Sequence, residues 1–485
     1  METKDFKELT QHKETVADGS SEIQVSLDGL DSIEQTQTGK FSWLVSITAA
    51  IGGMLFGYDT GIISAVLVYI DNDLGHTLSS SGKELITSIT SGGAFIGAIF
   101  AGATADRFGR KIAIYVGSFL FTAGAIIQAA ANSLALMTVG RLVVGFGVGS
   151  AAMIIPMYIA ELSPAKYRGR MIGLDNMCIT GGQLVSYGVG AGFAHVQGGW
   201  RYMVGGGAIP AIILACMLPF CPESPRQLIY HGKEQEAEKV IRKIFPNGTD
   251  EQVRMKVRHI TIHVEEAKNM NAGKSQWWVL KQLYVVPANL RALIAACGLM
   301  AISQLSGFNS LMYFSPTFMG LFLVVAAIAF KWIPVNHDLS LAEGTTVGPP
   351  AIIVLVSMVF FVGFYSSGIG NTAWLSSEFF PMEVRAMGTM MLTMSCWGSN
   401  IIVASTFLTQ MENTTPSGTF GFYAAICVLG WVSIYFCYPE VKNMTLEDIR
   451  EVFSHGFGVK RARELQKQMK ADRKMASVSD ENVKV

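Results

Sequence analysis

The sequence predicts an all-α integral membrane protein built from two related helical bundles. Of its 485 residues, 50% are hydrophobic and only 15% are charged. A soluble protein of this length carries closer to a quarter charged residues. Long apolar runs recur along the chain, and two short motifs of the first half return in the second half. Composition, apolar runs and the internal repeat together point to this fold class.

Apolar runs long enough to cross a bilayer define the expected elements. A helix needs about 20 apolar residues to cross ~30 Å of hydrocarbon. The expected spans are 42–67, 85–104, 112–131, 134–160, 172–194, 201–220, 291–314, 351–375, 387–410 and 419–438. A shorter apolar run, 318–333, brings the total to about 11 apolar segments.

The runs divide the chain into five parts. These are a polar N-terminal tail (1–40), a six-helix bundle (41–220), a polar segment (221–290), a second bundle (291–438, shortened near 315–335) and a C-terminal tail (439–485). The segment 221–290 contains charged amphipathic stretches, which are typical of short helices on a membrane face.

Basic residues predict the orientation of the chain. The loops 105–111 and 166–170, the segment 221–290 and the tail after 440 are rich in Lys and Arg. The positive-inside rule therefore predicts that both termini are cytoplasmic. The first 40 residues contain no charged-then-apolar leader, so we expect no cleaved signal peptide. We expect a multi-pass protein of the plasma membrane.

Composition also argues against several classes of function. The formal net charge is zero, so charge gives no reason to expect a nucleic-acid partner. The seven cysteines are scattered and show no ligand spacing, so we expect no metal site and no disulfides. No nucleophile–base pair stands out, so we do not expect an enzyme. The expected partners are the lipid bilayer and a small neutral solute, with the protein acting as a monomer.

An internal repeat relates the two bundles. "ELSPAKYRG" (161–169) and "EFFPMEVRA" (378–386) share the pattern E-x-x-P-x-x-x-R. Pro-Glu recurs at the same offset, at 222–223 and 439–440. Paired halves of this kind are typical of secondary transporters, which hold their substrate between the halves near the bilayer midplane.

The second half is shorter than the first. "GYD" (57–59) has a counterpart in "GFN" (307–309), but from there to the repeated Glu the second half lacks about one helix and its loop. Eleven spans would place the basic tail outside. The simplest resolution is that 318–333 does not cross and lies as a re-entrant or interfacial segment. The alternative is that part of a twelve-span parent was lost by splicing or a gene-model error.

Several motifs together resemble the sugar porter family of the major facilitator superfamily. They include "GGMLFGYDTGIIS" (52–64), "GATADRFGRK" (102–111), "GRLVVGFGVG" (140–149), "PESPR" (222–226) and "QLSGFNSLMYFSPT" (304–317). The chain is most similar to fungal proton-coupled myo-inositol and hexose transporters, over roughly 41–453. "GFGVG" alone could suggest a dinucleotide loop, but within a span it indicates close helix packing.

The resemblance implies a major facilitator fold of two pseudo-symmetric bundles with 12 spans. It implies symport of myo-inositol or a hexose by alternating access, with the proton as coupling ion and no other cofactor. The eighth span and a second D-R-x-G-R loop of the family are absent. A same-fold alternative is an uncoupled hexose facilitator. The missing span also leaves open, as another class, a receptor or defective isoform that binds without transport.

Asp59 lies inside the first apolar run, where a charge is disfavoured. A carboxylate at a helix centre costs roughly 2.5–3.5 kcal/mol on insertion scales, so a partner must offset that cost. Arg141 is the expected partner, and the resemblance implies the same pairing. A nearby cation favours the carboxylate and burial favours the neutral acid, so alternating exposure can load and release a proton. We expect proton coupling at this pair; the alternative is a structural ion pair.

A neutral polyol favours a site of amides and aromatic rings. Asn and Gln carry a donor and an acceptor, and Trp offers a ring face with one N–H. From the motif matches we expect substrate contacts from Gln183, Gln304, Asn309, Tyr313, Asn371, Trp374, Trp397 and Asn400. Asn371 replaces a Pro found in many members and resembles the inositol branch. The alternative is that these side chains only join helices, or gate the path in the case of Tyr313.

A set of charged residues gathers at the predicted cytoplasmic face. The set is Asp106, Arg107, Arg110, Glu161, Arg168, Glu223, Glu378, Arg385 and Glu440. The resemblance implies a salt-bridge latch that holds the outward-open state, whereas the alternative is positive-inside anchoring. Because one basic loop is missing, we expect a bias toward inward-open conformations.

Overall fold

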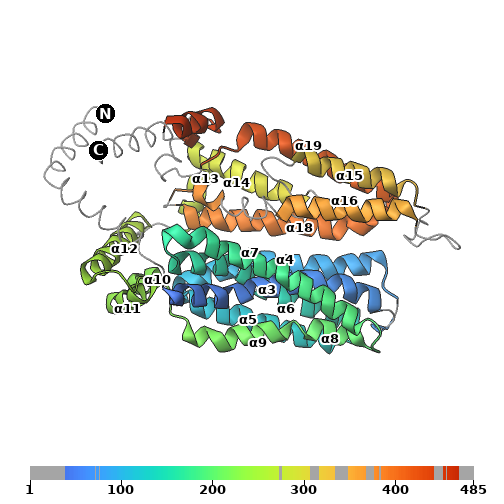
Figure 1. The fold of residues 1–485 in the computed structure, drawn as a ribbon, viewed down its shortest axis with the longest axis horizontal. Coiled ribbons are helices and arrows are strands. Elements are labelled where there is room, and N and C mark those ends of the chain that lie inside the picture. The colour runs from blue at the N-terminus through green and yellow to red at the C-terminus, as the bar shows by residue number, and fades with distance from the viewer. Residues whose placement is uncertain are drawn as a thin grey trace, which may run out of the picture.

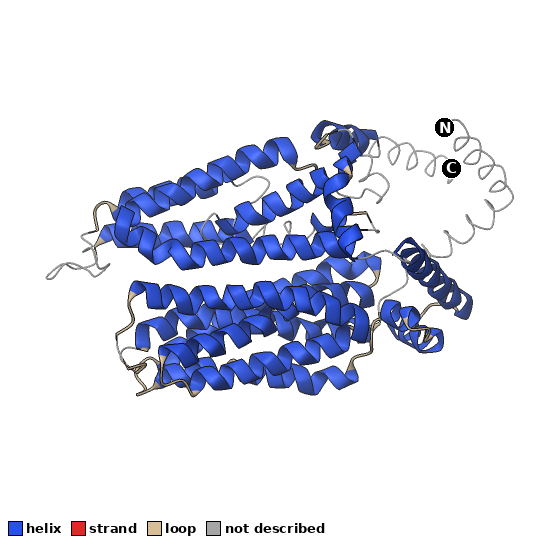
Figure 2. Ribbon diagram, turned by 180° about the vertical axis from the view of Figure 1, so that it is seen from behind, coloured by secondary structure: helices blue, strands red, loops and turns tan. Residues whose placement is uncertain are grey.

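The computed structural model describes residues 39–70, 73–75, 77–271, 276–305, 316–333, 348–366, 376–381, 384–441, 452–454 and 456–468. Over these residues the chain is helical and contains no strand. The helices form two groups whose long axes run side by side (Figures 1 and 2). The predicted all-α class with two bundles is therefore confirmed.

The first half contains long helices joined by short loops. They are α3 (Lys40–Tyr69), α4 (Ser80–Phe108), α5 (Arg110–Ala129), α6 (Leu134–Leu162), α7 (Ala165–Phe193), α8 (Gly199–Gly205), α9 (Ala208–Met217) and η1 (Leu218–Phe220). Apolar composition explains their formation, since a backbone in lipid must satisfy its own polar groups. Ser79 caps α4 and Ser133 caps α6 by accepting a backbone N–H, which fixes where those helices begin.

Short amphipathic helices follow the first half. They are α10 (Pro225–Tyr230), α11 (Glu234–Ile244) and α12 (Asp250–Asn271). They project from one end of the molecule (Figure 1), which we call the base; the opposite end is the distal end. In α11, Ala237, Val240, Ile241 and Ile244 are buried, as the amphipathic pattern predicts.

The second half contains α13 (Gln276–Val285), α14 (Pro287–Leu305), α15 (Pro316–Phe330), α16 (Pro349–Ser366), η2 (Ser376–Phe379), α18 (Arg385–Thr414) and α19 (Pro416–Cys437). Its own buried cluster includes Leu299, Phe380 and Tyr423. All members of this cluster belong to the second half.

In the described part of the chain, eight helices are long and apolar enough to cross a membrane. They are Lys40–Tyr69, Ser80–Gly102, Arg110–Ala129, Leu134–Leu162, Gly199–Phe220, Pro287–Leu305, Met387–Thr414 and Pro416–Cys437. The helix α7 is long enough but more polar, because it contains Arg168, Arg170 and Asp175 near its beginning. It packs lengthwise against α3 inside the first half.

The segment 318–333, expected to be re-entrant or interfacial, lies mostly in α15, which packs against helices of the second bundle. The helix α15 runs beside α16 and α19 (Figure 1). Phe330 stacks on Phe420 of α19 with ring centroids 5.0 Å apart, and Ser417 Oγ donates to the Ala327 carbonyl at 2.6 Å. The helix α15 has 15 residues and is not among the described helices that are long enough to cross a membrane, so its placement as a re-entrant or interfacial segment stays a prediction. The residues before it, 306–315, lie outside the described part.

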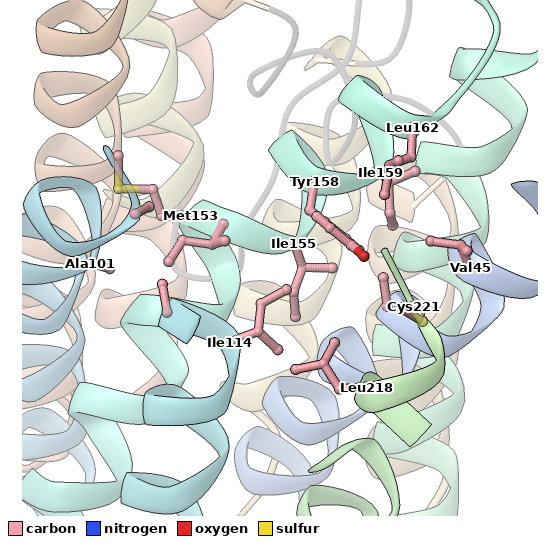
Figure 3. Packing of buried hydrophobic residues seen from close by; sticks show 14 of the residues in the cluster. Val45, Ala101, Ile114, Met153, Ile155, Tyr158, Ile159, Leu162, Leu218 and Cys221 are labelled. Carbon is pink, nitrogen blue, oxygen red and sulfur yellow. The ribbon is translucent and has the colours of Figure 1, made fainter. Parts of the chain in front are cut away.

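Close packing of α6 with its neighbours forms the core of the first half. Met153, Ile155, Tyr158 and Ile159 of α6 are buried against α3, α5 and η1 near the base (Figure 3). Toward the middle, a Cβ added at Gly149 would lie 2.1 Å from the Ala94 carbonyl of α4. The "GFGVG" motif therefore allows close helix contact, as the sequence predicted.

Candidate functional site

A buried ion pair joins the second turn of α6 to the second half of α3. Arg141 Nη1 donates to Asp59 Oδ1 at 2.6 Å, and the two side chains are only 3% and 8% exposed. Arg141 Nε also donates to the Ile86 carbonyl of α4 at 3.2 Å. Three helices therefore hold this guanidinium. The expected contact between Asp59 and Arg141 is present; its role in proton coupling stays a prediction.

Glycines of α3 place this helix tightly against α7. A Cβ added at Gly57 would lie 1.8 Å from the Ile179 carbonyl, and one at Gly61 would lie 2.1 Å from Ser186 Oγ. Only glycine permits such an approach of two backbones. The seam fixes the rotation of α3, so that Asp59 faces Arg141 while the glycines face α7.

Amide side chains connect the two halves beside the ion pair. Asn400 of α18 accepts a hydrogen bond on Oδ1 from Ser91 Oγ of α4 at 2.7 Å. Its Nδ2 donates to Gln304 Oε1 of α14 at 3.2 Å. Two predicted substrate residues, Gln304 and Asn400, are thus brought together at the interface between the halves, in contact with the first half through Ser91.

Trp397 lies one helical turn from Asn400, and its side chain packs against residues of the first half. Its ring meets Phe56 of α3 edge-on, with centroids 5.5 Å apart. The residue is 5% exposed and belongs to the same buried cluster as Leu55 and Met153. Its indole Nε1–H is buried and has no hydrogen-bond acceptor among the described residues.

The structure gives less information on the remaining predicted substrate residues. Gln183 lies on the α7 face that packs against Gly61, with its carbonyl accepting from Ser186 Oγ at 2.7 Å. Asn309, Tyr313, Asn371 and Trp374 lie outside the described residues.

At the base, part of the predicted charge set forms one cluster. Arg110 is 7% exposed, and its Nη2 lies 3.1 Å from Glu161 Oε1. Glu223 accepts the backbone N–H groups of Arg110 at 3.1 Å and of Lys111 at 3.2 Å, which caps the beginning of α5. Gly109 precedes this cap with φ +103°, and a Cβ there would lie 2.5 Å from Glu223 Oε2.

The sequence did not indicate which residues of the predicted charge set would form this buried cluster. Arg107 and Arg168 are exposed. Arg385 Nε donates to the Phe380 carbonyl at 3.1 Å, and Glu440 is exposed. The side chains of Asp106 and Glu378 lie outside the described part. Among the described side chains, the contacts of Arg110 with Glu161 and Glu223 lie in the first half. The role of the set as a latch stays a prediction.

Two buried carboxylates were missed. Glu84 of α4 accepts hydrogen bonds from Thr409 of α18, and Asp175 of α7 is 4% exposed, with Oδ1 lacking a partner among the described residues. Glu84 directly precedes the predicted span 85–104, so the hydropathy pattern places it outside that span. Asp175 does lie inside a predicted span and could have been found by the reasoning applied to Asp59.

Comparison with known proteins places this site in a family. The family model described as "Sugar (and other) transporter" matches residues 45–335 and 317–453. The two matches overlap at 317–335, where the sequence predicts a shortened second half.

Curated relatives cover nearly the whole chain. Myo-inositol transporter 1 of Cryptococcus neoformans is 38% identical, covering 93% of this chain and 87% of the relative. Myo-inositol transporter 1 of Saccharomyces cerevisiae is 37% identical, covering 88% and 81%. The first alignment runs over 496 positions, more than the 485 residues of this chain, so the relative carries residues that this chain lacks.

Solved structures agree on the fold. The proton:xylose symporter XylE of the major facilitator superfamily superposes with a TM-score of 0.67 at 23% identity, covering 85% of this chain and 99% of that one. The inward-open XylE from E. coli gives a TM-score of 0.66 at 24% identity, with 85% and 100% covered. From the family match and these relatives, the chain belongs to the Sugar (and other) transporter family and has the major facilitator fold.

Proposed function

We propose that this protein is a proton-coupled symporter that moves myo-inositol, or a hexose of similar size, across a membrane by alternating access. The relatives at 35–38% identity are named myo-inositol transporters, which supports the choice of solute. The base, with its basic segments, faces the cytoplasm, and the protein acts as a monomer in the plasma membrane.

The observation that carries the proposal is the buried pair of Asp59 and Arg141. An unpaired carboxylate in a lipid-spanning helix is costly, and a guanidinium at 2.6 Å offsets that cost. When Asp59 takes a proton, the pair loses its charge attraction, and Arg141 keeps its bond to the Ile86 carbonyl. Protonation therefore changes the balance of contacts between α3 and α6 without leaving Arg141 entirely unpartnered.

The interface beside this pair offers the groups that a polyol needs. Gln304 and Asn400 carry amide donors and acceptors, and Trp397 carries a buried N–H without an acceptor among the described residues. Buried donors are normally satisfied, so a solute hydroxyl is a suitable acceptor here. Of the residues outside the described part, we propose Asn309, Tyr313, Asn371 and Trp374 as further contacts on the motif matches alone.

Uptake of labelled myo-inositol in transporter-deficient yeast tests the proposal. We expect accumulation above the outside concentration, lost on adding a protonophore. Asp59→Asn should lose accumulation but keep solute exchange across the membrane, because it keeps the shape and removes the acid. Asp59→Glu keeps the acid and serves as the matched control.

Other results would assign a different function. Uptake that is indifferent to both the protonophore and Asp59→Asn indicates an uncoupled facilitator. Solute binding to the purified protein without uptake, in cells that display it on the surface, indicates a non-transporting receptor or isoform.

A further inference from the structure

A row of polar contacts joins α4 to α18 in the distal part of the molecule. Along one face of α4 it uses Ser80, Glu84, Thr87 and Ser91, spaced by three or four residues. Their partners on α18 are Glu412, Thr409, Ala404 and Asn400, in descending order because the two helices run antiparallel. We call these residues the distal ladder. Such spacing keeps side chains on one helix face, so the ladder is a continuous seam between the halves.

Glu84 makes the strongest contact of the distal ladder. Its Oε1 accepts the backbone N–H of Thr409 at 2.7 Å, and its Oε2 accepts Thr409 Oγ1 at 2.6 Å. The residue is 5% exposed. Hydrogen bonds to an ionised acceptor are stronger than neutral ones. Both carboxylate oxygens are thus satisfied by the opposite half.

The partners of Glu84 make the contact reversible. A buried carboxylate without hydrogen bonds is costly, so the halves are held together at this end as long as Thr409 provides them. When the halves separate, water reaches the carboxylate and replaces the same two donors. The contact therefore resists opening without making the opened state unreachable, as a gate must.

Other contacts of the described residues differ from the distal ladder. At the base, the buried cluster of Arg110, Glu161 and Glu223 lies within the first half. Near the middle, Phe56 and Trp397 make an apolar contact between the halves.

We propose that Glu84 is a gate residue of the transport cycle, which holds the distal end closed through Thr409. This assignment rests on the proposed function in one respect, that the distal end faces outside. Under it, the structure is the state closed to the outside, and breaking the Glu84–Thr409 contact shifts the protein toward outward-facing conformations.

Thiol labelling of the full-length protein in intact cells tests the proposal. Phe95 of α4 faces Gly398 of α18 and lies deeper than Glu84 by ~16 Å along the helix. A Phe95→Cys reporter is treated with a membrane-impermeant maleimide from outside, and labelling at this position is quantified by peptide mass spectrometry. Adding Glu84→Ala should raise the labelling rate about tenfold, because both bonds to the opposite half are lost.

Two pairs of variants separate a gate from a general structural role. Glu84→Gln keeps one acceptor for the Thr409 N–H and a group that can pair with its hydroxyl, so its labelling should stay near that of the parent. Thr409→Val should raise labelling, whereas Thr406→Val should not. Among the described residues, the one hydrogen bond of Thr406 Oγ1 is to the Ile402 carbonyl of its own helix, at 2.7 Å.

The labelling results test the role of Glu84 as a gate without any measurement of transport. Labelling unchanged by Glu84→Ala and Thr409→Val, or raised as much by Thr406→Val, would overturn it. Because no solute or proton gradient is used, the gate can be confirmed even if the protein fails to accumulate myo-inositol. Labelling of the Phe95→Cys reporter only from the cytoplasmic side in Glu84→Ala would also overturn it.

Discussion

Trp397 places a hydrogen-bond donor where the two halves meet. Its indole N–H is buried and lacks an acceptor among the described residues, although its ring is well packed against Phe56. A group of this kind costs free energy in the empty site and regains it when a ligand supplies an acceptor. Under the proposed function, that ligand is the polyol.

We therefore expect Trp397→Phe to weaken solute binding while keeping the fold. The ring contact survives and the donor is lost, so the KM for myo-inositol should rise about five- to tenfold, which corresponds to ~1 kcal/mol. Measured uptake against solute concentration checks this. An unchanged KM would show that the indole N–H does not contact the solute.

Asp175 is another buried residue with a polar atom that has no hydrogen-bond partner among the described residues. It is 4% exposed, and its Oδ1 lies against Gly53, where a Cβ would approach it to 2.3 Å. Burying a polar atom without a hydrogen bond is unfavourable. Asp175→Leu, which has a similar branched shape, should raise the free energy of unfolding by ~1–3 kcal/mol.

Thermal denaturation of the purified protein measures this effect. The matched control is Asp73→Leu, because Asp73 accepts the indole N–H of Trp200 at 2.7 Å and its loss should lower stability. A lower melting temperature for Asp175→Leu would mean that the carboxylate has a favourable partner in solution.

Sequence reasoning found the charged pair but not all the buried acids. Asp59 and Arg141 stand out because each interrupts an apolar run, and their partnership follows from the cost of leaving either alone. The interface role of Glu84 was not predicted because this residue lies near the beginning of a helix. Hydropathy does not distinguish a capping residue from an interface residue at such a position. Nothing in its neighbours indicates Thr409, which is far away in the chain.

At the scale of elements, glycine determines how near α3 comes to α7. A side chain at Gly57 would collide with the Ile179 backbone rather than with a flexible side chain, so the helices would have to separate. Gly57→Ala should lower stability by ~1–3 kcal/mol and move Asp59 away from Arg141.

Gly181→Ala on α7 is the matched control. Nothing lies within 4 Å of a Cβ at that position, so alanine should be neutral or slightly stabilising there. The melting temperatures of the two variants give the comparison. Equal stability of Gly57→Ala and the parent would show that the seam is looser than described.

Element positions were predictable to within a few residues where hydropathy changes sharply, as for α5 and α19. The helix α4 begins at Ser80, earlier than the apolar run, because Ser79 caps it and polar residues fill its first turns. Hydropathy did not predict which helices α15 would contact. Ala326, Ala327 and Ala329 are buried and let α15 pack closely against the second bundle.

At the scale of the whole molecule, the internal repeat predicted two bundles, and the structure has them. The repeat did not predict that α4 would face α18. Spans that are apolar on every side contain no sequence signal for which face meets the other half. The polar contacts of the distal ladder determine which face of α4 meets α18. They can be recognised as a set only when the positions of both helices are known.

Movement of one half against the other should stop when the distal ladder is locked. Thr87 Oγ1 lies 3.5 Å from the Ala404 carbonyl, so cysteines at these two positions are within reach of a short bifunctional thiol reagent. Cross-linking the Thr87→Cys, Ala404→Cys double variant with a reagent that contains a reducible bond should reduce uptake to background, and reduction should restore it. The two single variants are the controls, and undiminished uptake in the cross-linked pair would contradict a rocking motion of the halves.

The contact of Phe56 with Trp397 has a mechanical consequence. It lies near the middle of α3 and α18, between the distal ladder and the base. When a rigid bundle rotates, atoms near the rotation axis move least and atoms at the ends of the helices move farthest. If this aromatic pair is the pivot, each half can tilt with little sliding of the rings. A solute bound beside the rings then becomes accessible from the other side of the membrane while the residues around it move little.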